Sequence, residues 1–200
     1  MAAPQTLLAM SGANPGPTPL SQAALLVIDA QNEYLDGRLR LHGIDAAVDE
    51  IARLIARARK LGRPVVHVRH RGQPGGTFDP EAHGGQIIDA VAPRDGETVV
   101  DKSLPNAFAG TELMPRLAQT GTRQLVVAGF MTHLCVSASV RSAIDHRLFS
   151  TVVASACATR DLPSATGGSV VPASTLHEAT LAALADRFAV VVANAAALPD

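Results

Sequence analysis

Residues 124–136 read Gln124-Leu-Val-Val-Ala-Gly-Phe-Met-Thr-His-Leu-Cys-Val136, and their pattern is the strongest indication of the fold class. Its apolar run predicts a strand buried on both faces, and Gly129 predicts a turn that leads into a helix. In open α/β sheets, ligands bind at the edge where such strands end, so Cys135 lies at a candidate site. A cysteine near a helix N-terminus is expected to have its pKa lowered from about 8.5 towards neutrality, which favours the nucleophilic thiolate. The alternative interpretation is that Cys135 is a small buried hydrophobic residue.

Strand and helix patterns alternate along the chain. Short apolar runs bounded by Gly, Pro or polar residues predict six strands, at residues 23–29, 64–68, 98–101, 124–128, 149–154 and 188–192. Apolar residues at helical spacing predict helices at residues 44–58, 111–117, 132–147 and 174–186. This order predicts an α/β fold, a three-layer α/β/α sandwich with a mainly parallel, roughly six-stranded sheet.

Length and composition indicate one domain. The chain has 200 residues, of which 47% are hydrophobic, and this content argues against disorder. Residues 1–20 contain four prolines and are predicted to form an extended N-terminal arm, while residues 21–200 form a single domain. Residues 70–97 are rich in Gly and Pro and lack clear periodicity, which is typical of a functional or partly disordered segment.

Charge and cysteine content exclude several classes of protein. The net charge is −1 with no long run of one sign, so we expect neither a nucleic-acid nor a membrane partner. The two cysteines, Cys135 and Cys157, are too few for a disulfide framework and fit a reducing compartment. The first ten residues lack a signal-peptide pattern, and no apolar run approaches the roughly 20 residues of a membrane span. A cytoplasmic location is therefore expected.

Three chemically active residues follow or end three of the predicted strands. Asp29 ends the first, Lys102 the third, and Cys135 follows the fourth. Parallel strands with right-handed crossovers place these ends at one edge of the sheet, so we expect the three side chains to meet. The alternative for Asp29 and Lys102 is a structural ion pair, or a helix cap by Asp29, because a carboxylate after a buried strand is costly unless it is paired.

Three motifs carry a resemblance to a known family. They are Leu25-Leu-Val-Ile-Asp-Ala-Gln-Asn-Glu-Tyr34, Val100-Asp-Lys-Ser-Leu-Pro-Asn-Ala-Phe108 and Gly129-Phe-Met-Thr-His-Leu-Cys-Val136. Over roughly residues 22–193 the chain resembles the isochorismatase-like cysteine hydrolase superfamily, which includes nicotinamidases, N-carbamoylsarcosine amidases and streptothricin hydrolases. The resemblance implies a catalytic triad of Asp29, Lys102 and Cys135. It also implies a cis peptide bond between Phe130 and Met131, and an oxyanion hole formed by the N–H groups of Met131 and Cys135.

The chain departs from the nicotinamidase pattern at the metal site. Nicotinamidases have an Asp-x-His motif after the second strand, whereas this chain has His67-Val-Arg-His-Arg-Gly72. His67, His70 and His83 are the nearest candidate ligands, and without the Asp we expect no metal and no cofactor. His133 stands where nicotinamidases usually have Asp. True isochorismatases replace the nucleophilic cysteine with Gly, so the presence of Cys135 favours hydrolysis of an amide or ureide.

The resulting hypothesis is a cysteine-dependent amidohydrolase that cleaves a C–N bond of a small amide, ureide or carbamoyl compound through a thioester. The alternatives are an isochorismatase-type hydrolase of a non-amide bond, a nicotinamidase, and a catalytically idle scaffold. We expect a homo-oligomer, a dimer or tetramer. Five residues either line the substrate pocket or pack in the core: Gln31, Tyr34, Phe108, Phe130 and His133.

Overall fold

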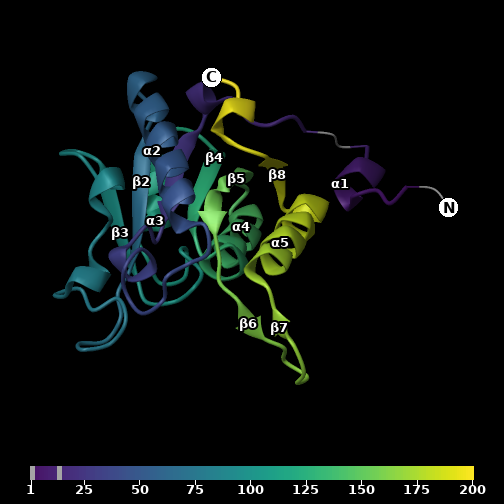
Figure 1. The fold of residues 1–200 in the computed structure, drawn as a ribbon. Helices are drawn as coiled ribbons and strands as arrows, with labels where there is room; N and C mark the ends of the chain where they lie inside the picture. The colour runs from purple at the N-terminus through teal and green to yellow at the C-terminus, as the bar shows by residue number, and fades with distance from the viewer. Residues whose placement is uncertain (1–2, 13–14) are drawn as a thin grey trace.

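Six parallel strands form the centre of the molecule in a computed structural model that describes residues 3–12 and 15–200 (Figure 1). The sheet has the order β3-β2-β1-β4-β5-β8, and every neighbouring pair is parallel. The expected α/β fold with a six-stranded parallel sheet is thus confirmed. The strands are β1 (Ala24–Ile28), β2 (Val65–His70), β3 (Thr98–Lys102), β4 (Gln124–Phe130), β5 (Phe149–Ala158) and β8 (Ala189–Val192).

Helices cover both faces of this sheet and give the three layers (Figure 1). α2 (Ile44–Lys60) packs on one face, and its buried residues recur every three or four positions because one stripe of the helix faces the sheet. The other face is covered by α3 (Leu113–Gln119), α4 (Ser137–Asp145) and α5 (Ala173–Arg187). β1 lies in the middle and is buried along its whole length, since its residues alternate between the two cores.

Gly129 allows β4 to approach β1 closely beside the end of the sheet. Its φ is +120°, and a Cβ at this position would lie 2.0 Å from the carbonyl oxygen of Ile28. Only glycine fits both the backbone conformation and the space. This close approach brings the segment after β4 next to Asp29, the residue that follows β1.

Several elements differ in extent from the sequence expectation: β2 and β4 run two residues further, and the helix expected at residues 132–147 is a π-helical turn followed by α4. α3 and β5 differ as well. α3 begins two residues later than predicted, because the Thr111 hydroxyl accepts a hydrogen bond from the Leu113 N–H before the helix starts. β5 continues to Ala158 rather than ending at Ala154, and it pairs with β4 through a shift in register between Val127 and Gly129. The longer β5 carries its following residues to the edge where Cys135 lies.

The described parts of the N-terminal arm fold back onto the domain. α1 (Leu7–Met10) is a single helical turn, and the Leu7 N–H donates to the Asp186 carboxylate at 2.8 Å. Thr18 bonds to Thr151 and to Gln124. The remaining arm residues, 1–2 and 13–14, lie outside the described residues.

Two short segments connect these elements near the carboxyl edge. A hairpin of β6 (Leu162–Pro163) and β7 (Val170–Val171) projects from the body (Figure 1), and its two-residue strands are too short to give a sequence pattern. Residues 70–97 contain two 3-10 turns, His83–Gly85 and Asp89–Val91. Among the helices of the described residues, none has both the length and the apolar character needed to cross a bilayer.

Candidate active site

Asp29, Lys102 and Cys135 meet at the carboxyl edge of the sheet. The Lys102 Nζ lies 2.7 Å from Asp29 Oδ2 and 3.4 Å from Cys135 Sγ. Asp29 follows β1, Lys102 ends β3, and Cys135 lies in a π-helical turn, Thr132–Val136, that joins β4 to α4. The three side chains therefore lie together as expected, because the carboxyl ends of parallel strands lie at one edge of the sheet.

Burial dominates the electrostatics of this group. Asp29 is fully buried, and burial raises the pKa of its carboxyl despite the opposing charge of Lys102. Burial, followed by the negative charge of Asp29, raises the pKa of the Cys135 thiol to about 12. The expectation that a helix N-terminus lowers this pKa is wrong, because the loss of solvent and the nearby carboxylate outweigh the helix and Lys102. In the resting site the cysteine is a thiol beside an Asp–Lys ion pair.

His70 is a third partner of Lys102, at the end of β2. Its Nδ1 lies 3.2 Å from Lys102 Nζ. Burial and the charge of Lys102 lower the pKa of His70 to about 4, so the imidazole is neutral and its Nδ1 accepts a proton of the ammonium group. Lys102 thus contacts three groups: it forms an ion pair with Asp29 and donates hydrogen bonds to Cys135 and His70.

The three candidate metal ligands lie in three different places. His67 is buried on the face covered by α2, where its Nε2 lies 3.3 Å from Glu97. His83 is exposed and contacts Asp36. Across residues 3–12 and 15–200, no cluster of three His, Cys, Asp or Glu residues has the arrangement of a metal site. His67, His70 and His83 therefore do not converge on one ion.

The Phe130–Met131 peptide bond is cis, as the resemblance implies. The next residue, Thr132, is buried, and its hydroxyl donates to the Ala158 carbonyl oxygen at 3.1 Å. The same hydroxyl lies 2.9 Å from Nδ1 of His177 on α5, and it accepts the imidazole proton because its own proton is already used. β5 and α5 together hold the turn that carries Met131 and Cys135.

The five residues considered for the substrate pocket have different surroundings. Tyr34 lies close to Asp29: burial and the negative charge of Asp29 raise the pKa of its hydroxyl, while Arg160 opposes the rise. His133 contacts the Thr159 hydroxyl. Tyr34 is therefore placed beside Asp29, whereas the described contact of His133 is with Thr159, the residue after β5.

The other three pack as structural residues. The Gln31 amide is fully buried, donates to the carbonyls of His70 and Gly85, and accepts the His70 N–H at 2.8 Å. Phe130 is buried in the core, with its ring 5.9 Å from that of Tyr34. Phe108 packs against His146, at the end of α4 remote from Cys135.

Two residues near the triad were not predicted from the sequence. Phe78, from the irregular segment 70–97, packs its ring 5.0 Å from Tyr34 and 5.2 Å from His70. Arg160 follows β5, and its positive charge lowers the pKa of His133 after the larger effect of burial. The Nε of Arg160 is buried and has no hydrogen-bond partner among the described residues. The sequence predicts that β5 ends at Ala154, so it gives no signal that Arg160 lies at this edge of the sheet.

The fold and this buried group define the class of protein: an α/β protein with a buried cysteine beside a lysine, consistent with a cysteine hydrolase. A model of the isochorismatase domain matches residues 23–196. The chain therefore belongs to the isochorismatase family of hydrolases. A crystal structure of an isochorismatase from Pseudomonas putida KT2440 has a TM-score of 0.93 and 46% identity, over 97% of this chain and 99% of that one.

Several related proteins carry informative names. YddQ of Bacillus subtilis, an isochorismatase family protein, is 40% identical over 84% of this chain and 94% of its own length. Streptothricin hydrolase of Streptomyces noursei is 35% identical, over 88% of this chain and 70% of the relative. Maleamate amidohydrolase of Pseudomonas putida is 36% identical, over 67% and 70%. Relatives of this chain are thus amidohydrolases.

Proposed function

We propose that this protein is a cysteine-dependent amidohydrolase that cleaves a C–N bond of a small amide, ureide or carbamoyl substrate. The observation that carries the proposal is the buried group in which Lys102 lies within 3.4 Å of Cys135 Sγ and 2.7 Å of Asp29. Acyl transfer by a cysteine needs a nucleophile, a base and a cation, and all three lie at one edge of the sheet.

The raised pKa of Cys135 determines the order of proton transfers in the proposal. Asp29 takes the Sγ proton as the sulfur attacks the substrate carbonyl, and the N–H groups of Met131 and Cys135 receive the oxyanion. Asp29 then gives this proton to the leaving amine as the C–N bond breaks, which leaves a thioester on Cys135. Water, deprotonated by Asp29, releases the acid and restores the thiol. Lys102 and His70 hold the Asp29 carboxylate in place.

The test is to trap the thioester on Cys135 by acid quench and mass spectrometry. Cys135→Ser is expected to fold and to lose at least about a thousandfold in turnover, because an alcohol is far less acidic than a thiol. The matched control is Cys157→Ala, which removes the other buried thiol and keeps activity. Turnover of Cys135→Ser within tenfold of wild type would exclude the covalent mechanism and leave an isochorismatase-type reaction.

Arg160 supports a narrower substrate class, an amide that also bears a carboxylate. Its guanidinium lies near Tyr34 and His133, and its buried Nε has no protein partner among the described residues. Arginine binds planar carboxylates through paired N–H groups. Maleamate, the substrate in the name of one relative, is a small carboxylate of this kind.

We further propose that the protein is a homo-oligomer. Leu104, two residues after Lys102, and Leu134, next to Cys135, are 53% and 39% exposed. Large apolar side chains that gather around a site are often covered by a partner. Light scattering at micromolar concentration tests this, and a monomer mass would contradict it.

A further inference from the structure

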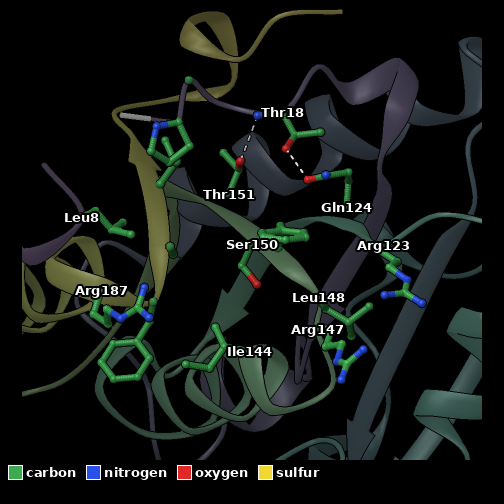
Figure 2. A pocket seen from close by; sticks show the side chains of 16 residues that line it. Leu8, Thr18, Arg123, Gln124, Ile144, Arg147, Leu148, Ser150, Thr151 and Arg187 are labelled. Atoms are coloured by element: carbon green, nitrogen blue, oxygen red, sulfur yellow. Dashed lines mark hydrogen bonds between the residues drawn. The ribbon is translucent and has the colours of Figure 1, made fainter. Parts of the chain in front are cut away.

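A groove of about 760 Å³ lies at the edge of the sheet opposite the triad (Figure 2). It lies where β4, β5 and β8 begin, whereas Asp29 and Cys135 lie where strands end. The end of α4 and part of the N-terminal arm complete its walls. None of its lining residues belongs to the candidate active site.

The charged residues of this groove are all positive. Arg123, Arg147 and Arg187 line it, and no Asp or Glu does. None of the three arginines takes part in an ion pair within the part of the chain that the structure describes. The nearby carboxylate of Asp186 accepts the Leu7 N–H. Because the whole chain has a net charge of −1, this is a local excess of positive charge.

A buried hydroxyl in the groove lacks a partner. Ser150, at the start of β5, is 5% exposed and lines the groove. Its Oγ is covered and has no hydrogen-bond partner among the described residues. Figure 2 shows the side chain turned into the space between the arm and α4. A buried hydroxyl is normally satisfied, so its lack of a partner points to an acceptor from outside the chain.

The remaining walls are apolar. Phe149 is 62% exposed and Ile144 is 37% exposed, and Leu8, Leu148 and Phe188 extend the same surface. An inorganic anion would satisfy the arginines and leave these walls in water. A neutral apolar molecule would leave the arginines and Ser150 unused. The charge and the walls together fit an occupant with one anionic group and an apolar body.

We propose that this groove is a second ligand site, for a free amphipathic monocarboxylate. The carboxylate receives N–H bonds from Arg123 and Arg147, which Figure 2 shows on the side of the groove opposite Arg187, and the Ser150 O–H, and the apolar body covers Phe149 and Ile144. The site is separate from the proposed reaction, so it stands whether or not Cys135 is a nucleophile.

The experiment is calorimetric titration of the full chain with decanoate. Decanoate is expected to bind at least tenfold more tightly than decanol, which lacks the charge, and than acetate, which lacks the apolar body. Arg123→Gln/Arg147→Gln is expected to weaken decanoate binding at least tenfold. Arg38→Gln/Arg94→Gln, which removes two exposed arginines elsewhere, is the charge-matched control and keeps the affinity. Ser150→Ala is expected to weaken binding and to raise the melting temperature of the free protein, because an unsatisfied hydroxyl is removed.

Three results would overturn the proposal. Decanoate could bind no better than decanol, or equally well to both double variants. Alternatively, sedimentation could show a dimer that Phe149→Arg dissociates and decanoate does not disturb, in which case a second copy of the chain occupies the groove.

Discussion

The Lys102 ammonium group lies 2.7 Å from Oδ2 of Asp29, and neither side chain is exposed to solvent. Taking two charges out of water is costly, and their attraction offsets this cost only while both are present. The pair therefore has two roles in the proposed mechanism. It keeps Asp29 ionised as a base, and it keeps the buried group electrically neutral while Cys135 is a thiol.

The first prediction concerns the stability of this pair. Lys102→Met is expected to lower the free energy of unfolding by about 3–5 kcal/mol, because it leaves a buried carboxylate without a partner. Asp29→Asn/Lys102→Met has no buried charge and is expected to recover part of the loss while remaining inactive. Urea denaturation of the two variants measures this. Equal stability of wild type and Lys102→Met would show that the pair does not hold in solution.

The second prediction concerns the ionisation of Cys135. Burial and the charge of Asp29 raise the pKa of this thiol to about 12, so its alkylation by iodoacetamide is expected to be slow at neutral pH. Asp29→Asn removes the negative charge and is expected to move the alkylation profile to lower pH, whereas Lys102→Met moves it higher. The profiles are measured in a Cys157→Ala background, so that only one thiol reports. Identical profiles in all variants would show that neither residue acts on Cys135 electrostatically.

The third prediction concerns Gln31, whose side chain links the backbone of two segments. Its buried amide makes three hydrogen bonds to the backbone of His70 and Gly85. Gln31→Leu is expected to lower the free energy of unfolding by about 2–4 kcal/mol, because it leaves buried backbone groups unpaired. It also lowers activity, since His70 contacts Lys102. Gln73→Leu, at an exposed position, is the control. An equal loss of unfolding free energy in both variants would show that the hydrogen bonds of Gln31 do not stabilise the site.

The sequence predicted the strands because each is a short apolar run bounded by turn residues. The convergence of Asp29, Lys102 and Cys135 followed from strand order, which needs no side-chain detail. The sign of the Cys135 pKa shift could not be predicted in this way, because it depends on how completely the surrounding segments exclude water. Phe78 helps to exclude water beside Tyr34. It comes from a segment without periodicity, so its position could not be predicted.

Other features of the site depend on contacts between distant segments. The sequence identified His70 only as a candidate metal ligand. Its 3.2 Å contact with Lys102 shows that it is a hydrogen-bond acceptor for the Lys102 ammonium group. The sequence did not predict that Arg160 lies near the site, because β5 continues four residues beyond its predicted end, to Ala158. The pairing of Gly129 with Cys157 and of Phe130 with Ala158 produces this extension, and it has no local sequence signal.

The fourth prediction concerns the pH dependence of stability. The pKa of His70 is about 4 in the folded protein, lowered by burial and Lys102, against about 6.5 in the unfolded chain. Between these values the unfolded state binds a proton that the folded state does not, so stability falls as pH falls from 6.5 to 4. His70→Gln is expected to reduce this fall by on the order of 1–2 kcal/mol, after discounting for partial exposure of the imidazole.

The matched control for this measurement is His83→Gln. His83 is exposed and contacts Asp36 rather than the triad. The free energy of unfolding is measured at pH 7 and pH 4.5 for both variants and the wild type. A pH dependence that is the same in His70→Gln and His83→Gln would show that His70 does not titrate abnormally.

The last prediction concerns Arg160 and the substrate carboxylate. If the guanidinium binds this group, Arg160→Met is expected to lower kcat/KM for maleamate by about 100-fold or more, because a charge-assisted pair with a carboxylate contributes about 3 kcal/mol. Maleamide, the neutral diamide, tests the same reaction without the carboxylate, and its kcat/KM is expected to change by less than about threefold. Arg160→Lys keeps the charge and loses the paired geometry, so it is expected to give an intermediate loss. Equal losses for both substrates would show that Arg160 supports the fold of the site, near Tyr34 and His133, and does not select a carboxylate.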